Sequence, residues 1–436
     1  MATSLIRERI DSGPFVPTMF LVIAIGFLLN LVDGFDVVAM SVAGPSISAD
    51  WGITDDQKGL ILSAALFGMA IGAALIAPYS DVIGRRKMIL LATVLIGISM
   101  VVTGFLPVSV PLMIAIRVIS GLGIGVIMAS GAAIATEFAP EKYRNLAVTM
   151  VVMGYPFGAM VVGPIAGFII PRQGWEMLFV YGGVATLILG SLFFFVLPES
   201  VEFLANKKSP TERDLLQLND VLKRLKREPF AQFPPRPTDG NLKSANVASL
   251  FENNLGLDTI FLWGIYFLGF MTLYFIMAWT PSLFVSAGFT RAEGIFALTI
   301  HNFGAVVGIV IIGLLTTRVR LAKPIGFFFL GSAVFLGLLY VQKPQSTLVL
   351  NSAIFMIGIL LQGGFTAMYA LAARIYPTSI RATGIGWGAG LGRTGAILSP
   401  TVAGFLSAAG WDIYDLSMLF AVPLIIAGIL VMRYKV

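Results

Sequence analysis

Residues 58 to 106 read KGLILSAALFGMAIGAALIAPYSDVIGRRKMILLATVLIGISMVVTGFL, and this stretch decides the fold class of the chain. It contains two apolar runs of about 20 residues each, the length of helix that crosses a bilayer core of about 30 Å. Only the charged break Asp81-Val82-Ile83-Gly84-Arg85-Arg86-Lys87 separates the two runs. We therefore expect two antiparallel membrane helices joined by a short polar turn.

Runs of the same kind recur along all 436 residues, of which 57% are apolar and 12% charged. Because about 25% of the residues of a soluble domain are charged, this composition indicates an all-α membrane protein. To within a few residues at each boundary, we expect twelve transmembrane helices at 17–42, 58–79, 87–106, 109–136, 145–170, 177–197, 257–285, 293–315, 323–341, 346–374, 381–408 and 414–433.

The distribution of Lys and Arg predicts the orientation of these spans. An even number of spans places both termini on one side of the membrane, and most of the basic residues fall in breaks on that side. The breaks on the opposite side contain only Lys58, Arg172, Arg291 and Lys343. Because loops rich in Lys and Arg stay in the cytoplasm, we expect a multi-pass protein of the inner membrane with both termini cytoplasmic.

The composition also excludes several classes of protein. With no Cys and a single His, the chain cannot form a thiolate zinc site, an iron–sulfur cluster or a His-ligated metal site. The dipeptide Gly-Lys is absent, which excludes a Walker loop for ATP. The basic residues lie between spans instead of on one water-exposed face, which argues against nucleic-acid binding. We expect no metal, no cofactor and, because His301 alone offers no nucleophile and base pair, no enzymatic activity.

One long break, residues 198–256, divides the spans into two sets of six. We therefore expect an N-terminal half at 1–197, a cytoplasmic linker at 198–256 and a C-terminal half at 257–436. The linker contains the flexible or polyproline-like segment 233–237. It also contains an amphipathic helix with its apolar face formed by Leu215, Leu218, Leu222 and Leu225. Such a helix lies on the inner membrane surface or packs on the spans, and its sequence fits both arrangements.

An internal repeat supports the division into two halves. The segment GAMVVGPIAGF at 158–168 matches GAILSPTVAGF at 395–405, and Pro140 with Arg144 matches Pro377 with Arg381 at the same separation. Two six-helix halves that meet at the bilayer midplane are the architecture of alternating-access carriers.

These features together resemble the major facilitator superfamily over essentially the whole chain. The resemblance rests on the break 81–87, the glycines of 158–167 and the two sets of six spans. The chain departs from the family pattern at Ala77, where the family has Gly, and at 317–320, where the second copy of the break is degraded to TRVR.

Three further segments resemble, more narrowly, the aromatic acid:proton symporters of that superfamily. They are DGFD at 33–36, PES at 198–200, and IRATG at 380–384 leading to Arg393.

Five ionisable residues lie deep inside the expected spans, from the midplane toward the outer half: Asp33, Asp36, Arg117, His301 and Arg393. Each costs roughly 2.5 to 3.5 kcal/mol at the bilayer centre unless it has a partner or faces water. The set is neutral overall when His301 is neutral, so an organic anion would leave it negative. One proton per monocarboxylate restores neutrality in a medium of low dielectric constant, which favours proton symport.

Each of these residues has a functional and a structural interpretation. We expect Arg393, bordered by glycines in span eleven, to hold the substrate carboxylate by its two-pronged guanidinium; the alternative is a permanent ion pair with an Asp. We expect Arg117 to pair with Asp33 or Asp36 and to take part in proton coupling. The pKa of an ordinary His lies near neutrality, so His301 suits a proton relay, although it also suits a plain hydrogen-bonding role.

The resemblance implies a gate of ion pairs at the inner ends of the helices. Its expected members are Asp81, Arg85, Arg86, Glu137 and Arg144, together with Arg381, the second-half counterpart of Arg144.

Aromatic side chains line one face of span seven, and a flat aromatic substrate could stack on some of them. They are Trp263, Tyr266, Phe270, Tyr274 and Trp279. As substrate contacts we select Tyr274, which lies near the midplane and carries a hydroxyl, and Trp387 and Gln362 from neighbouring spans.

We therefore expect a monomeric inner-membrane carrier that takes up a small aromatic carboxylate, such as a hydroxybenzoate, together with protons. Two alternatives keep the fold: a proton-coupled antiporter that exports organic compounds, and a symporter of a non-aromatic organic acid. A sensor that has kept the fold is a third, but it would be expected to carry a cytoplasmic output domain.

Overall fold

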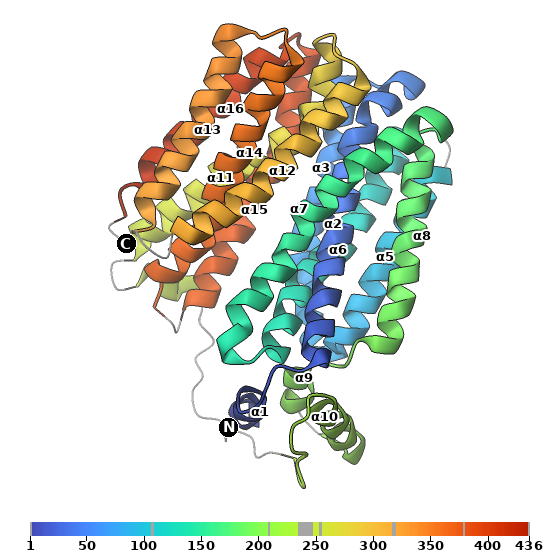
Figure 1. Cartoon of the computed structure of the whole chain (residues 1–436), viewed down its shortest axis with the longest axis vertical. Helices are drawn as coiled ribbons and strands as arrows, with labels where there is room; N and C mark the ends of the chain where they lie inside the picture. The colour runs from blue at the N-terminus through green and yellow to red at the C-terminus, as the bar shows by residue number, and fades with distance from the viewer. Residues whose placement is uncertain are drawn as a thin grey trace.

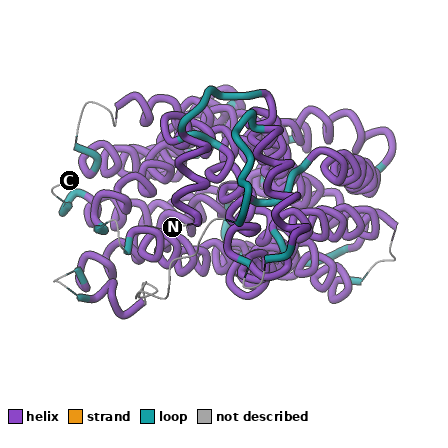
Figure 2. The backbone as a smooth tube through the Cα atoms, turned by 90° about the horizontal axis from the view of Figure 1, so that it is seen from below, coloured by secondary structure: helices purple, strands orange, loops and turns teal. Residues whose placement is uncertain are grey.

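A computed structural model of the chain describes residues 2–105, 109–207, 210–233, 247–252, 255–315, 320–377 and 380–434. All regular elements in these ranges are helical (Figure 2). Residues 317–319 of the degraded second break and 234–237 of the Pro-rich segment lie outside the described ranges. The helices are α1 Ala2–Asp11, α2 Pro17–Trp51, α3 Asp55–Ile71, η1 Gly72–Ile76, η2 Ala77–Tyr79, α4 Ser80–Ile83, α5 Arg85–Phe105, α6 Val110–Phe138, α7 Glu141–Gln173, α8 Glu176–Val196, α9 Val201–Asn206, α10 Glu212–Arg224, η3 Val247–Phe251, α11 Gly256–Ser286, α12 Arg291–Leu315, α13 Ala322–Gln342, α14 Thr347–Ile375, α15 Arg381–Ala408 and α16 Ile413–Val431.

Eleven of these helical stretches are long and apolar enough to cross a membrane. The twelfth expected span is α15, which is long enough but less apolar because it contains many glycines and Arg393. The largest boundary error lies in α2, which continues past the expected end at residue 42 to Trp51. The helix accommodates Pro45 and ends at Gly52, whose φ of 63° suits a glycine after a helix.

The transmembrane helices form two groups with the same internal packing (Figure 1). In the first group α2 packs on α7, α3 on α6, and α5 on α8. In the second group the corresponding pairs are α11 with α15, α12 with α14, and α13 with α16. The two groups are therefore pseudo-symmetric six-helix halves, as expected from the repeat.

The glycines of the repeat explain part of this symmetry. A Cβ at Gly158 of α7 would overlap with the backbone carbonyl of Leu31 in α2, and a Cβ at Gly395 of α15 would overlap with that of Phe267 in α11. In each half, the repeated glycine thus lets the fifth span approach the backbone of the first.

The two groups meet most closely at the end of the molecule opposite the N-terminus, which we call the upper end; the end that carries α1, α9 and α10 is the lower end (Figure 1). The Ser63 hydroxyl donates to the Ile397 carbonyl at 2.7 Å, and the Ser41 hydroxyl lies 2.7 Å from the Met277 carbonyl. Lys58 is buried beside the ring of Trp279, with its Nζ 5.0 Å from the ring centroid. The groups diverge toward the lower end.

The amphipathic linker helix is α10, and its apolar face is covered by protein. Leu218, Leu222 and Leu225 are fully buried, while α10 packs on α9. The segment after α10 is tied to α1, because the Arg227 guanidinium donates to the carbonyl of Ile10 at 2.9 Å. This burial supports packing on the rest of the protein over insertion of the leucines into the membrane surface.

Candidate functional site

Asp36 and Arg117 form a buried ion pair between α2 and α6. The Arg117 guanidinium donates to both carboxylate oxygens of Asp36, at 2.8 and 2.9 Å, and the Ser120 hydroxyl donates to one of them at 3.1 Å. Asp36 is 0% exposed and Arg117 2%. Ser120 lies one helical turn after Arg117, so α6 presents a guanidinium and a hydroxyl to the same carboxylate. Of the two partners expected for Arg117, the structure brings Asp36 to it.

Asp33 lies one turn earlier on α2 and is also fully buried, but neither of its carboxylate oxygens has a hydrogen-bond partner. The next residue, Gly34, packs directly on the backbone of Tyr155 in α7, where a Cβ would overlap with the carbonyl. This close approach fixes the packing of α2 on α7 next to Asp33. A buried carboxylate without hydrogen bonds is costly when charged, so its environment differs sharply from that of Asp36.

Arg393 comes from the middle of α15, in the second group, and lies within electrostatic range of Asp33. Its contact with the first group is made by a terminal guanidinium nitrogen that lies 3.1 Å from the Met128 sulfur. A thioether is a weak acceptor. Among the described residues, Arg393 therefore does not form the carboxylate ion pair that was its alternative role, although Asp33 lies within its electrostatic range.

Three tyrosines surround this pair of charges. Tyr155, Tyr274 and Tyr369 all lie within electrostatic range of Arg393. The Tyr155 hydroxyl donates to the Met277 sulfur at 3.8 Å, and so links α7 of the first group to α11 of the second. Tyr155 and Tyr274 are also within electrostatic range of Asp33.

The other aromatic residues of span seven pack mainly within the second group. Phe270 contacts Phe365 with ring centroids 4.4 Å apart, and Trp279 is fully buried near the upper end. Trp387 is 43% exposed and stacks on Trp263 at 6.2 Å near the lower end. The structure therefore places Tyr274 beside Arg393 and places Trp387 about two turns of α15 away from it.

His301 and Gln362 lie apart from the paired charges. His301 is buried on α12, where its backbone packs on Gly358 of α14, and its Nδ1 has no hydrogen-bond partner. Gln362 is partly buried on α14 itself. The helices α12 and α14 pack along each other within the second group, so His301 lies at a contact between two helices of one half.

A second cluster of charges lies at the lower ends of the first group. Arg85, at the start of α5, forms an ion pair with the buried Glu137 of α6 and contacts Asp81 at 3.3 Å. The hydroxyl of Ser200 donates to Glu137, and Glu202 lies 3.9 Å from Arg85. Three of the expected gate residues therefore meet around the guanidinium of Arg85.

The remaining expected gate residues have other partners. Arg144 pairs with Asp11 of α1 at 3.6 Å. The side chain of Arg86 donates to the carbonyl of Phe194. Arg381 donates to the carbonyl of Tyr376 at 3.4 Å.

The structure adds residues to the lower-end cluster that sequence reasoning did not select. Arg7 of α1 donates to Glu202 at 2.5 Å, and the carboxylate of Glu199 accepts from the backbone N–H of Arg86 at 3.0 Å. The segment PES at 198–200 was a signal for Glu199 and Ser200. Arg7 carried no such signal, because nothing in the local sequence brings residue 7 to residue 202.

The chain was compared with known proteins. The model of the family described as Major Facilitator Superfamily matches residues 26–297 and 262–436. The 4-hydroxybenzoate transporter PcaK of Pseudomonas putida is 32% identical, over 97% of this chain and 94% of its own length. A gallate transporter of Pseudomonas putida is 29% identical, over 98% and 94%.

Among solved structures, the xylose transporter XylE from E. coli in a partially occluded inward open conformation superposes with a TM-score of 0.76. It is 16% identical, over 97% of this chain and 98% of XylE. This likeness shows the fold alone. With the family match over most of the sequence and the two pseudo-symmetric halves, it confirms the resemblance seen in the motifs: the chain belongs to the Major Facilitator Superfamily and is a membrane transporter, not an enzyme.

Proposed function

We propose that this protein takes up a small aromatic carboxylate together with protons across the inner membrane by alternating access, with its lower end in the cytoplasm. One observation carries the proposal: Asp33 and Arg393 lie in opposite halves within electrostatic range of each other, and neither forms an ion pair with a described residue. A free guanidinium is suited to a carboxylate, and a buried carboxylate without hydrogen bonds is suited to taking up a proton. The names of the relatives support aromatic acids as the substrate class.

In this mechanism the substrate carboxylate binds Arg393, and the ring packs among the tyrosines. The guanidinium charge, which partly balances Asp33 in the empty protein, is then neutralised by the substrate. The ionised form of Asp33 consequently becomes less stable in its buried site, and the carboxylate takes up a proton. The ion pair of Asp36 with Arg117 stays neutral within the first half, so one proton accompanies each monocarboxylate.

The contacts between the halves fit alternating access. Those at the upper end include hydrogen bonds from small hydroxyls, glycine packing, as between Gly59 of α3 and the backbone of Pro400 in α15, and the contact of Lys58 with the Trp279 ring. Such contacts can separate without leaving a buried ion pair broken. The two halves can therefore rock about the level of Asp33 and Arg393, which exposes the substrate site first to one side of the membrane and then to the other.

Uptake should depend on the proton gradient. In proteoliposomes, accumulation of radiolabelled 4-hydroxybenzoate should rise with an inward proton gradient and collapse when a protonophore is added. A fluorescent pH indicator inside the vesicles should report acidification that starts with the substrate. Uptake unaffected by the protonophore, with no acidification, would refute symport, and efflux of cationic dyes driven by the gradient would favour the exporter.

Arg393→Lys should weaken binding of the substrate acid by about one to two decades in Kd. Lys keeps the charge but loses the planar two-point donor, and a charge-assisted hydrogen bond is worth roughly 1.5 to 3 kcal/mol. Titration of purified protein with the acid and with its amide analogue checks this result. The native protein should prefer the acid strongly and the variant should discriminate less. Equal discrimination by both proteins would leave Arg393 without a role in recognising the carboxylate.

A further inference from the structure

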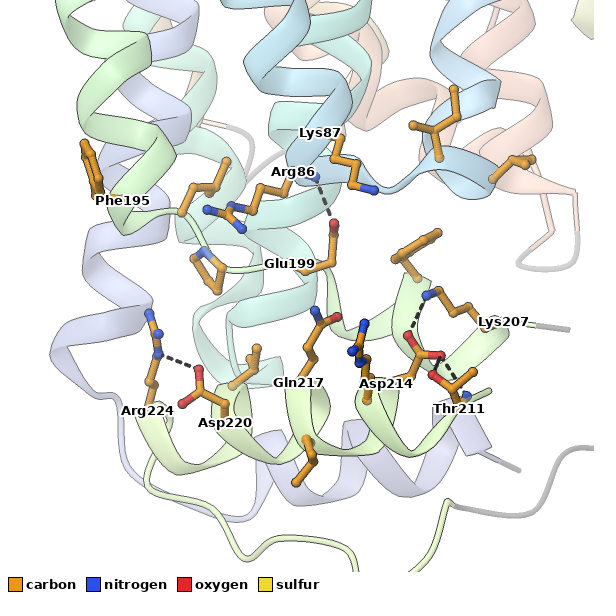
Figure 3. Close-up of a pocket in the computed structure, with 18 residues that line it drawn as sticks. Arg86, Lys87, Phe195, Glu199, Lys207, Thr211, Asp214, Gln217, Asp220 and Arg224 are labelled. Atoms are coloured by element: carbon orange, nitrogen blue, oxygen red, sulfur yellow. Dashed lines mark hydrogen bonds and ion pairs between the residues drawn. The ribbon is translucent and has the colours of Figure 1, made fainter. Parts of the chain in front are cut away.

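A groove of about 1050 Å³ lies at the lower end, between α10 and the ends of α5 and α8 (Figure 3). No step of the proposed transport mechanism uses it. Its floor is the polar face of α10, from which Gln217 points upward, and its opposite wall carries Arg86 and Lys87. Five basic side chains line it: Arg86, Lys87, Lys207, Arg213 and Arg224.

Two of these basic side chains are already neutralised. Lys207 binds Asp214 at 2.5 Å, and Arg224 binds Asp220 at 3.0 Å. Burial raises the pKa of Asp214, but hydrogen bonds from Lys207 and Thr211 outweigh this effect and lower the pKa to about 2. Asp214 is therefore ionised at neutral pH, and Lys207 stays bound to it.

Glu199 lines the same groove, and its carboxylate is bound by backbone N–H groups, which leave its negative charge in place. The carboxylate of Glu199 accepts hydrogen bonds from the backbone N–H groups of Arg86 and Ser200, at 3.0 and 2.9 Å. The guanidinium of Arg86 donates to the Phe194 carbonyl, which carries no formal charge, and its Nε is buried without a partner.

Lys87 and Arg213 face the same groove from opposite walls. Neither forms an ion pair with a described acidic residue. The lining of the groove thus carries five basic and three acidic side chains, and the charges of Arg86, Lys87 and Arg213 together exceed that of Glu199 by two.

The rim of the groove is apolar and exposed. Val82 is 76% exposed, Phe195 79% and Leu216 65%. Phe195 belongs to the last turn of α8, and Arg86 to the first turn of α5. Because these are ends of transmembrane helices, the rim lies at the level where lipid head groups meet acyl chains.

We propose that this groove binds the head group of an anionic phospholipid from the leaflet at the lower end. The phosphate lies among Arg86, Lys87 and Arg213, and the acyl chains leave along Phe195 and Val82. Basic pockets at the ends of transmembrane helices recognise such head groups. The apolar rim favours a lipid over free phosphate, because only a lipid has acyl chains that can contact it. Since Arg86 follows Arg85 directly, the bound lipid also braces the turn that holds the lower-end ion pairs.

The test uses the full-length protein in a neutral detergent, with lipid binding measured by native mass spectrometry and melting temperature measured in parallel. Phosphatidylglycerol should bind and raise the melting temperature, because it binds the folded state. Phosphatidylcholine and inorganic phosphate at the same concentrations should do neither. Equal stabilisation by inorganic phosphate would overturn the lipid proposal in favour of a soluble anion.

The variant Lys87→Gln/Arg213→Gln should bind phosphatidylglycerol on the order of 10-fold to 30-fold more weakly. Both side chains are exposed, so the variant should fold; Arg213→Lys, which keeps the charge, should bind like the native protein. The matched control is Lys142→Gln/Lys223→Gln, which removes two exposed charges of the lower end outside the groove and should bind within about 2-fold of the native protein. An equal loss in the control would show that only the general positive charge attracts the lipid and would overturn the proposal.

Discussion

Asp36→Asn should lower the free energy of unfolding by about 3 to 5 kcal/mol and abolish transport. The substitution keeps the size of the side chain but leaves the Arg117 guanidinium, which is 2% exposed, without its counter-charge. Breaking a buried pair from one side costs this much because an uncompensated charge remains in a medium of low dielectric constant. The melting temperature of the purified protein and the denaturant midpoint measure the loss.

Two further variants test the cause of that loss. Asp36→Leu/Arg117→Met removes both charges and should recover most of the stability without recovering transport. Asp220→Asn is the matched control, because it breaks the exposed pair with Arg224 at 3.0 Å and should cost no more than about 1 kcal/mol. If the double variant were as unstable as Asp36→Asn, the loss would come from packing and not from the unpaired charge.

Asp33→Asn should not destabilise the protein, but it should abolish the accumulation of substrate. The carboxylate of Asp33 is buried and has no hydrogen-bond partner, so a neutral amide should leave the melting temperature unchanged or raise it. The amide cannot take up a proton, and the ratio of internal to external substrate should fall to about one under an imposed gradient.

Exchange of labelled for unlabelled substrate across the membrane should survive in Asp33→Asn, because it needs binding and rocking but no net proton movement. Asp36→Asn, three residues away on the same helix, serves as the comparison, since it should lose exchange as well. Full gradient-driven accumulation by Asp33→Asn would remove Asp33 from the coupling step. Loss of exchange in a well-folded Asp33→Asn would assign it to substrate binding instead.

The fold was predictable from the sequence because each segment that crosses a bilayer can be identified from its own length and hydropathy. Each transmembrane helix must be long and apolar whatever its neighbours are, so the expected and observed spans agree closely for most helices. The exception is α2, whose end lies at Trp51 and not near residue 42. Polar residues and Pro45 interrupt the apolar signal there, while packing against the other half keeps the backbone helical. The short helix α1 was not expected, because its polar sequence carries no signal of that kind.

The candidate site was predictable as a set of residues but not as a set of contacts. Ionisable residues in a span stand out by their cost, which selects Asp33, Asp36, Arg117, His301 and Arg393 without any structure. Their partners depend on how each helix is rotated and how far it has slid along its neighbour. The same applies at the lower end, where Arg144 joins Asp11 and not the cluster around Arg85.

By itself, the sequence therefore determined the membrane spans, the two-fold internal repeat, the family and the ionisable residues deep inside the spans. Only the tertiary structure decided that Asp36 neutralises Arg117 while Asp33 has no hydrogen bond and lies within electrostatic range of Arg393. The physical reason is that hydropathy depends on each residue and its near neighbours, whereas pairing depends on contacts between distant segments. The approach of Gly34 to Tyr155 sets the rotation of α2, and that rotation gives two aspartates one turn apart different environments.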